Sequence, residues 1–371
     1  MTTVLLAHPS AELYGSDRML LESARALLRR HRVVVALPTT GPLVTALESE
    51  GAEVVVVPVP VLRRDSLRPK GFARFMSSGA LAVRPMIDVL RRYRVDALYV
   101  NTIVLPLWTM AGRAAGVPTL CHVHEAEFIR NSLVRSTFFA PLRCADSVVF
   151  NSHTSASTVT MPRSRVIYNG VVGPSSSTAV RESLGSPVRL VQVGRISERK
   201  GTDVAVRAAQ LLTDRGLHVH LTVVGDSFAG NEAFERRVRS SAGANVTFAG
   251  HRTDVWESLA SADIALVPSR LEPFGNVAVE AMLSGRPVIA SATEGLLEIV
   301  DHGRTGLLVE PGNSRDLADA VVALTSDWTA ATAMTTSALS DATRRFSLDR
   351  YHREVVDAVA DLLDVDFAVA A

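Results

Sequence analysis

Two carboxylates eight positions apart, Glu272 and Glu280, stand in one segment and are the residues best suited to bind a polyol. Each can accept hydrogen bonds from adjacent hydroxyls, such as those of a sugar or a ribose. Two of them in one segment indicate a ligand with two polyol parts. The simpler alternative is a capped helix that carries two exposed acids.

The residues around these carboxylates predict where they lie. Residues 264–268 and 287–290 are short apolar runs typical of buried parallel strands, and residues 277–284 have the composition of a helix. In a strand, loop, helix, strand unit, the loop and the first helical turn face the ligand crevice. Residues 274–276 open this helix, where unpaired N–H groups and the positive dipole end favour a phosphate.

A second pair of chemically capable residues, Arg195 and Lys200, lies in a loop after the apolar run 188–193. Two cations five apart, with glycines flanking them, could clamp a diphosphate from both sides. Only two of the 39 Lys and Arg residues are lysine, which favours a specific use for the compact ammonium of Lys200. The alternative is a solvated loop without a ligand. If this loop lies opposite the segment that carries the two carboxylates, a phosphate site is favoured. Arg252, in a later loop, could form a wall for a base or a sugar ring.

The amino-terminal half offers two histidines, His122 and His124, where the apolar run 118–123 ends. A histidine at the carboxyl end of a parallel strand lies at the crevice. We place the two rings on opposite faces of the extended segment, so that only one of them faces a ligand. Alone, either is as readily a structural histidine as a functional one.

The alternation of strand and helix patterns predicts an α/β protein with two doubly wound parallel sheets. The pattern restarts at residue 188, after a stretch rich in Gly, Pro and Ser. We expect a Rossmann-like domain at 1–170, a linker at 171–186, a second Rossmann-like domain at 187–345 and a terminal helical segment at 346–371.

The composition excludes several classes of protein. With 371 residues, 47% of them apolar, and a formal charge of +1, the chain is a globular protein without the basic balance of a nucleic-acid binder. The two cysteines, Cys121 and Cys144, show neither disulfide nor zinc spacing. Residues 1–10 do not resemble a signal peptide, and no apolar run reaches the roughly 20 residues that span a bilayer. We therefore expect a cytoplasmic protein without a metal site.

Residues 61–95 depart from this average, because they hold nine Lys and Arg residues against two Asp. Aromatic and methionine side chains between the cations give the segment amphipathic character. Contact with anionic lipid at the inner face of the membrane, or with a phosphate-bearing acceptor, is one interpretation. A solvated basic face is the simpler one.

The pattern Glu-x-x-x-x-x-x-x-Glu formed by Glu272 and Glu280 resembles the hallmark of the retaining GT-B fold glycosyltransferases of family 4. Val-Gly-Arg-Ile-Ser-Glu-Arg-Lys-Gly, which contains Arg195 and Lys200, matches that family's diphosphate-binding pair. The segment 165–171, Arg-Val-Ile-Tyr-Asn-Gly-Val, resembles the family's approach to the interdomain linker. The resemblance spans most of the chain and is most specific between residues 188 and 310.

The resemblance implies two domains facing a cleft, the first on the acceptor side and the second binding a nucleotide sugar, with the terminal helix from residue 346 crossing back. It implies transfer of a sugar to a sugar or lipid-linked acceptor hydroxyl, with retention of configuration and with no metal or cofactor. Carried over by position, the resemblance implies that Glu272 binds the sugar hydroxyls and Glu280 binds the ribose hydroxyls. The remaining implied contacts to the donor are made by His124, close to the reacting sugar, by Phe274, Gly275 and Asn276, and by Gly15, which closes over the phosphates.

The sequence departs from the family pattern at three places. Gly15-Ser16 replaces a pair of glycines, Glu294-Gly295 stands where the family has Gly-Gly, and Val172 replaces a common Asp. A nucleotide-sugar epimerase or a glycosyl phosphorylase on the same fold is one alternative. A non-catalytic protein that binds sugar nucleotides or polysaccharides is another. The absence of a Gly-x-Gly-x-x-Gly loop disfavours a nicotinamide dehydrogenase.

Overall fold

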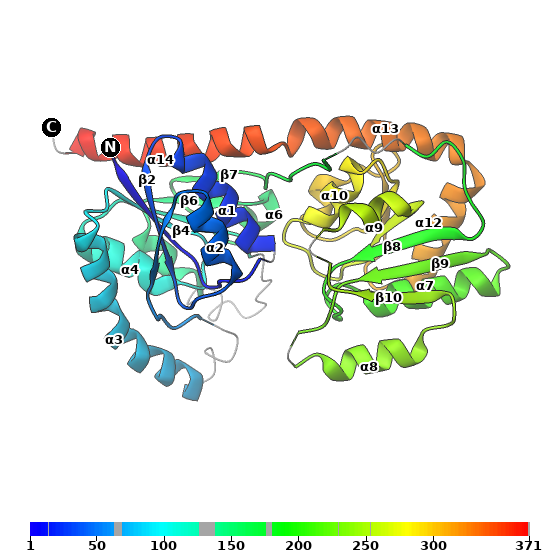
Figure 1. Cartoon of the computed structure of the whole chain (residues 1–371), viewed down its shortest axis with the longest axis horizontal. Coiled ribbons are helices and arrows are strands. Elements are labelled where there is room, and N and C mark those ends of the chain that lie inside the picture. The colour runs from blue at the N-terminus through cyan, green and yellow to red at the C-terminus, as the bar shows by residue number, and fades with distance from the viewer. Residues whose placement is uncertain are drawn as a thin grey trace. The chain divides into compact units, whose positions relative to one another are not determined.

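The structure is a computed structural model that describes residues 1–13, 15–62, 69–125, 138–175, 180–228, 230–252 and 254–369. Contacts divide the chain into two compact units (Figure 1). Unit 1 comprises Met1–Gly170 and Leu348–Ala371, and unit 2 comprises Val171–Ser347. The residues expected to form a linker, 171–186, therefore belong to unit 2.

Unit 1 is built on a seven-stranded parallel sheet in the order β3-β2-β1-β4-β5-β6-β7. Its strands are β1 (Thr3–Ala7), β2 (Arg32–Leu37), β3 (Glu53–Val56), β4 (Ala97–Val100), β5 (Thr119–Val123), β6 (Ser147–Phe150) and β7 (Ser164–Val166). Its helices are α1 (Gly15–Leu28), α2 (Pro42–Ser49), α3 (Pro69–Arg92), α4 (Pro106–Ala115), the 3-10 helix η2 (Ala140–Cys144), α6 (His153–Ser157) and α14 (Leu348–Val369).

Alternation along the central strands supplies a core on both faces of this sheet. Val4 and Leu6 of β1 pack in one cluster with α1, α2 and α14, whereas Leu5 and Ala7 pack in the other with α3 and α4. Successive side chains of a strand point to opposite faces, so a strand buried on both sides must be apolar throughout. The continuous apolar runs of the sequence reflect this double burial.

Unit 2 repeats the plan with a six-stranded parallel sheet in the order β10-β9-β8-β11-β12-β13. Its strands are β8 (Val188–Val193), β9 (Val219–Val224), β10 (Val246–Gly250), β11 (Ile264–Val267), β12 (Val288–Ser291) and β13 (Leu307–Val309). Its helices are α7 (Thr202–Asp214), α8 (Glu232–Ser241), α9 (Trp256–Ser261), α10 (Asn276–Leu283), α11 (Leu296–Ile299), α12 (Ser314–Ser326) and α13 (Trp328–Arg345). The two doubly wound sheets confirm the predicted fold class.

Each sheet has one point where the strand order reverses. In unit 1 the reversal lies between β1 and β4, and in unit 2 it lies between β8 and β11. The loops that leave the carboxyl ends of such a strand pair run in opposite directions and open a crevice for a ligand. The fold therefore predicts one ligand crevice at the carboxyl ends of β1 and β4, and another at the carboxyl ends of β8 and β11.

The last helix returns to unit 1, where α14 packs beside α1 (Figure 1). The hydroxyl of Tyr351 lies 2.8 Å from Oγ of Ser23, and Nε2 of His352 lies 3.0 Å from the Glu22 carboxylate. Phe346, two residues before α14, stays in unit 2 with its ring centre 5.7 Å from that of Phe274. The chain therefore changes unit at the start of α14.

The basic segment of the sequence contains a helix that its pattern did not predict. Helix α3 runs over 24 residues and includes Pro85. Residues 63–68, which hold three of the arginines, lie outside the described residues, as do the side chains of Lys70 and Arg74. Among the described helices, none combines the length and the apolar character that crossing a membrane requires. Membrane contact by this segment stays a prediction.

Gly201 brings the loop after β8 against the end of β11. It precedes α7 with φ of 65°, and a Cβ built there would lie 1.9 Å from the carbonyl oxygen of Pro268. Any side chain at this position would separate the two loops. The glycine is therefore required both for its backbone conformation and for the close approach.

We expect Gly201→Ala to destabilise unit 2 more than Gly216→Ala. Gly216 follows the other end of α7 with φ of 83°, but nothing lies within 4 Å of its Cβ position. Gly216→Ala should cost only the strain of the left-handed conformation, about 1–2 kcal/mol. Gly201→Ala adds a displacement of the Pro268 backbone, which brings the total to about 2–5 kcal/mol. Hydrogen exchange of the β8 amides measures the loss of stability in each variant. Equal losses in the two variants would contradict the close approach of Gly201 to Pro268.

Candidate active site

The loops that follow β8 and β11 are bound together by Arg270. Its backbone N–H donates to the carbonyl oxygen of Arg199 at 2.7 Å. Its guanidinium donates to both carboxylate oxygens of Asp203, at 2.8 and 2.7 Å, and to the carbonyl oxygen of Glu198 at 2.7 Å. A bidentate pair fixes orientation as well as distance. The two loops of the strand reversal therefore form one rigid surface.

Lys200 and Glu272 meet on this surface. The ammonium of Lys200 donates to Oε2 of Glu272, and the Ser269 hydroxyl donates to the same oxygen at 3.1 Å. The Arg199 guanidinium lies 3.9 Å from Oε1. Burial works against ionisation of Glu272, which is 8% exposed, but Lys200 and then Arg199 outweigh it and hold the pKa of its carboxyl below the ordinary value. The site thus contains an ionised carboxylate beside an ammonium.

Glu294 supports the loop that carries Glu272. The backbone N–H of Glu272 donates to the Glu294 carboxylate at 2.7 Å, and the N–H of Gly295 donates to the carbonyl oxygen of Glu272 at 3.0 Å. Glu294 adopts a positive φ of 41°, a conformation that costs energy for a residue with a side chain. The residue that departs from the Gly-Gly pattern is therefore a structural partner of the predicted sugar-binding carboxylate.

The start of α10 holds the other predicted donor contacts. Gly275 caps this helix with φ of 118°, and a Cβ there would lie 2.6 Å from a methyl group of Leu296. Asn276 and Glu280 are half-buried in the first and second turns. Phe274 is 3% exposed and packs on Phe346, so its ring belongs to the core and only its backbone borders this helix end.

The remaining predicted cations of unit 2 are exposed. Arg195 shares its loop with Lys200, and its guanidinium carbon lies 5.6 Å from the centre of the Phe228 ring. Arg252 follows β10. Of the residues predicted from sequence, the structure therefore joins Lys200 and Glu272 directly. Sequence reasoning missed Arg270 and Glu294 as their supports, because these contacts join segments that are distant in the chain. It also missed Ser269, which lies only three residues before Glu272 in the same loop.

In unit 1 the predicted histidine His124 lies just after β5, with Nε2 3.0 Å from Oδ1 of Asn101, which follows β4. His122 is buried, and its Nδ1 lies 2.5 Å from the hydroxyl of Tyr99. The prediction that the two rings point to opposite faces is wrong, since their centres lie 4.1 Å apart. Alternate residues of a strand share a face, and only His124 retains exposed surface.

Gly15 is the first residue of α1 and is exposed, while the preceding Tyr14 lies outside the described residues. Within the described part of the chain, no group of three or more His, Cys, Asp and Glu side chains is arranged to hold a metal ion.

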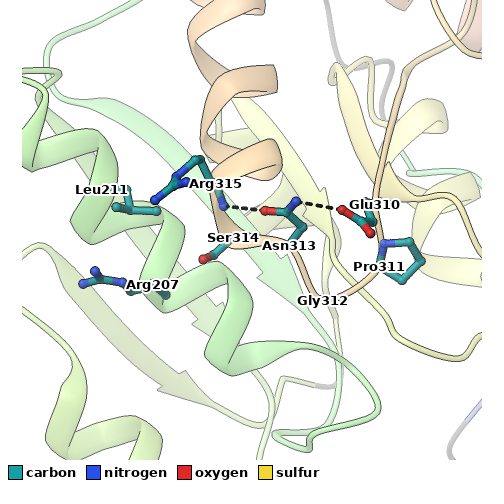
Figure 2. Close-up of a pocket in the computed structure, with 8 residues that line it drawn as sticks. All are labelled: Arg207, Leu211, Glu310, Pro311, Gly312, Asn313, Ser314 and Arg315. Atoms are coloured by element: carbon teal, nitrogen blue, oxygen red, sulfur yellow. Dashed lines mark hydrogen bonds between the residues drawn. The ribbon is translucent and has the colours of Figure 1, made fainter.

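Figure 2 shows a different cavity of unit 2, about 460 Å³ in volume, between α7, the start of α12 and the end of β13. The Asn313 side chain accepts from the backbone N–H of Arg315 at 3.1 Å and donates to Glu310 at 2.8 Å. Strand β13 is the edge of the sheet, two places from β11. None of the site residues predicted from sequence lines this cavity.

Comparison with known proteins places the two units in related families. Residues 187–327 match the family model for glycosyl transferases group 1, and residues 14–172 match the model for glycosyltransferase family 4. The solved structure of HepE from Anabaena in complex with UDP and glucose is similar, with a TM-score of 0.80 over 97% of this chain and 100% of that chain. At 22% sequence identity this similarity shows the fold alone.

Curated relatives match shorter segments. An uncharacterized glycosyltransferase from Methanocaldococcus jannaschii is 30% identical over 206 residues, which are 52% of this chain and 53% of that protein. A D-inositol 3-phosphate glycosyltransferase from Arthrobacter is 36% identical over 167 residues, 42% of this chain and 39% of that protein. The chain thus spans about half the length of these relatives or less. Because the two family models together match most of the sequence, the chain belongs to the group 1, family 4 glycosyltransferases.

Proposed function

We propose that the protein is a retaining glycosyltransferase that moves a sugar from a nucleotide-diphosphate sugar to an acceptor hydroxyl. The observation that carries this proposal is the contact between Lys200 and Glu272 where the strand order of unit 2 reverses. A cation that can bind phosphate and a carboxylate that can bind sugar hydroxyls lie there side by side. A nucleotide-diphosphate sugar has both groups joined by the bond that breaks.

The departing diphosphate gains negative charge as the glycosidic bond breaks. Lys200, Arg195 and the N–H groups at the start of α10 act on that charge more strongly in the transition state than in the ground state. As the phosphate draws the Lys200 ammonium toward itself, oxygens of Glu272 become available to sugar hydroxyls. In the free protein, Lys200 and Arg199 outweigh the effect of burial and hold the pKa of Glu272 below its ordinary value, so the carboxylate is ionised when the donor arrives.

Glu280 serves the ribose in this proposal, and Arg252 borders the nucleotide. The UDP and glucose bound to the similar HepE support a nucleotide sugar as the class of donor. His124 of unit 1 acts near the reacting sugar, and the acceptor is a glycan, a glycolipid or a small molecule. The acceptor hydroxyl attacks on the face that the phosphate leaves and gives its proton to the departing phosphate, so no side chain serves as nucleophile. Because cationic side chains contact the leaving diphosphate, the reaction requires no metal.

Donor binding should stabilise the protein against unfolding. A nucleotide sugar at 100 times its dissociation constant should add about 2.7 kcal/mol to the free energy of unfolding, which a thermal-shift assay detects. Glu280→Ala should abolish this stabilisation, because the ribose loses its acceptor. Glu257→Ala, which changes an exposed carboxylate of α9, is the control and should keep it. A full shift in Glu280→Ala would refute the ribose assignment.

Lys200→Met should lower kcat/KM by roughly 10²–10³-fold, the effect of losing one preorganised donor to a developing charge. It should also move the acid limb of the pH profile upward. Lys200 lowers the pKa of Glu272, and without it burial raises that pKa, so the carboxylate is lost at a higher pH. Lys200→Arg retains the charge and should leave the limb near its original position. An unmoved limb in Lys200→Met would contradict the coupling.

The reaction should proceed in excess EDTA and give a product with the anomeric configuration of the donor, as read from NMR couplings of the anomeric proton. An inverted product would contradict the same-face mechanism. Activity lost in EDTA and restored by Mg²⁺ would contradict the proposal that side chains alone neutralise the diphosphate.

A further inference from the structure

Four polar side chains form a continuous chain across the strand reversal of unit 1. His8 follows β1, Asn101 follows β4, His124 follows β5, and Asp17 lies in the first turn of α1. Oδ1 of Asp17 is 2.7 Å from Nε2 of His8, whose Nδ1 is 3.1 Å from Nδ2 of Asn101. Oδ1 of Asn101 is 3.0 Å from Nε2 of His124. Asp17, His8 and Asn101 are buried.

An ionised Asp17 at one end and a neutral His8 ring next to it together determine the direction of every hydrogen bond in this chain. An ionised Asp17 only accepts, so Nε2 of His8 carries a proton and donates it. With a neutral His8 ring, Nδ1 of His8 accepts from the amide N–H of Asn101. The amide oxygen of Asn101 then accepts from Nε2 of His124. These positions of the protons follow from the hydrogen-bond network as a whole.

His124 is therefore neutral and has one defined tautomer. Burial lowers the pKa of its ring to about 3. The His122 ring lies against it, with 4.1 Å between ring centres. The backbone N–H of His124 donates to the Glu125 carboxylate at 3.1 Å. Both the ring and the backbone that carries it are held in place.

We propose that Asp17, His8 and Asn101 are positioning residues that keep His124 protonated on Nε2, so that Nδ1 accepts a hydrogen bond from a hydroxyl of the bound sugar or acceptor. The identity of that hydroxyl rests on the proposed function. A chain whose donors all point toward a carboxylate polarises each member and makes Nδ1 a better acceptor. The amino-terminal end of α1 favours the negative charge of Asp17.

Unit 1 contains a matched control pair on the same helix. Glu22 of α1 lies 3.0 Å from Nε2 of His352, and both side chains are buried. No hydrogen bond among the described residues connects this pair to His124. Glu22→Gln therefore removes a buried carboxylate that faces a histidine without disturbing the chain from Asp17 to His124.

The test combines ¹⁵N NMR of the histidine rings with steady-state kinetics on the full chain. In wild type, His8 and His124 should both be protonated on Nε2. Asp17→Asn allows the chain to reverse, because an amide can donate to His8, and a fraction of His124 should become protonated on Nδ1. By analogy with the outer partners that orient metal-bound histidines, kcat should fall roughly 10–100-fold. Glu22→Gln should leave the His124 signals and kcat unchanged.

A double variant that combines Asp17→Asn with Asn101→Asp moves the carboxylate between the two rings. The carboxylate introduced at position 101 would accept from Nε2 of His124 and from Nδ1 of His8, while the amide introduced at position 17 would donate to Nε2 of His8. The variant should restore the His124 tautomer and most of kcat, which a purely structural role of Asp17 would not produce.

Three results would overturn the proposal. They are a wild-type His124 protonated on Nδ1, a His124 tautomer that is unchanged in Asp17→Asn, and an altered tautomer with unaltered kcat. The last result would leave the proposed glycosyl transfer intact. Conversely, a wild-type protein that transfers no sugar would reject the proposed function, while the tautomer measurement would still report on the chain of hydrogen bonds.

Discussion

A buried ion pair is costly, because both partners lose their hydration, and it persists only where neighbouring groups satisfy what remains. Lys200 and Glu272 form such a pair, with side chains 15% and 10% exposed. The features around it serve to keep the pair in place. Gly201 permits the loops to approach, Arg270 binds them together, and Glu294 holds the backbone of Glu272. Because this pair is costly and lies at the reversal of strand order, Lys200 and Glu272 are suited to exchange their contact with each other for contacts with a ligand.

The two units use the same topological position with different electrostatics. At the reversal of unit 2 the groups are ionic, as expected of a surface that receives a diphosphate. At the reversal of unit 1, His124 is a neutral ring and the carboxylate lies three side chains away, at Asp17. In the proposed reaction, one unit neutralises the leaving group while the other presents an acceptor to hydroxyls.

The sequence predicted the features that depend on local order. Doubly buried strands appear as apolar runs, and Glu272, Glu280, Arg195 and Lys200 stand out because each lies where such a run ends or where the next helix begins. The supports of these residues could not be predicted in this way. Arg270 and Asp203 meet only because β8 and β11 are neighbours, and His8, Asn101 and His124 meet only because β1, β4 and β5 are. The prediction that the rings of His122 and His124 point to opposite faces was wrong for a different reason, because alternate residues of a strand share a face.

The most direct measurement is a crystal structure of the full chain with a nucleoside diphosphate bound. The account predicts the terminal phosphate against the Lys200 ammonium and the first N–H groups of α10, with a longer distance between Lys200 and Glu272 than in the free protein. A diphosphate held instead in the cavity between α7 and α12, with the ion pair unchanged, would contradict it.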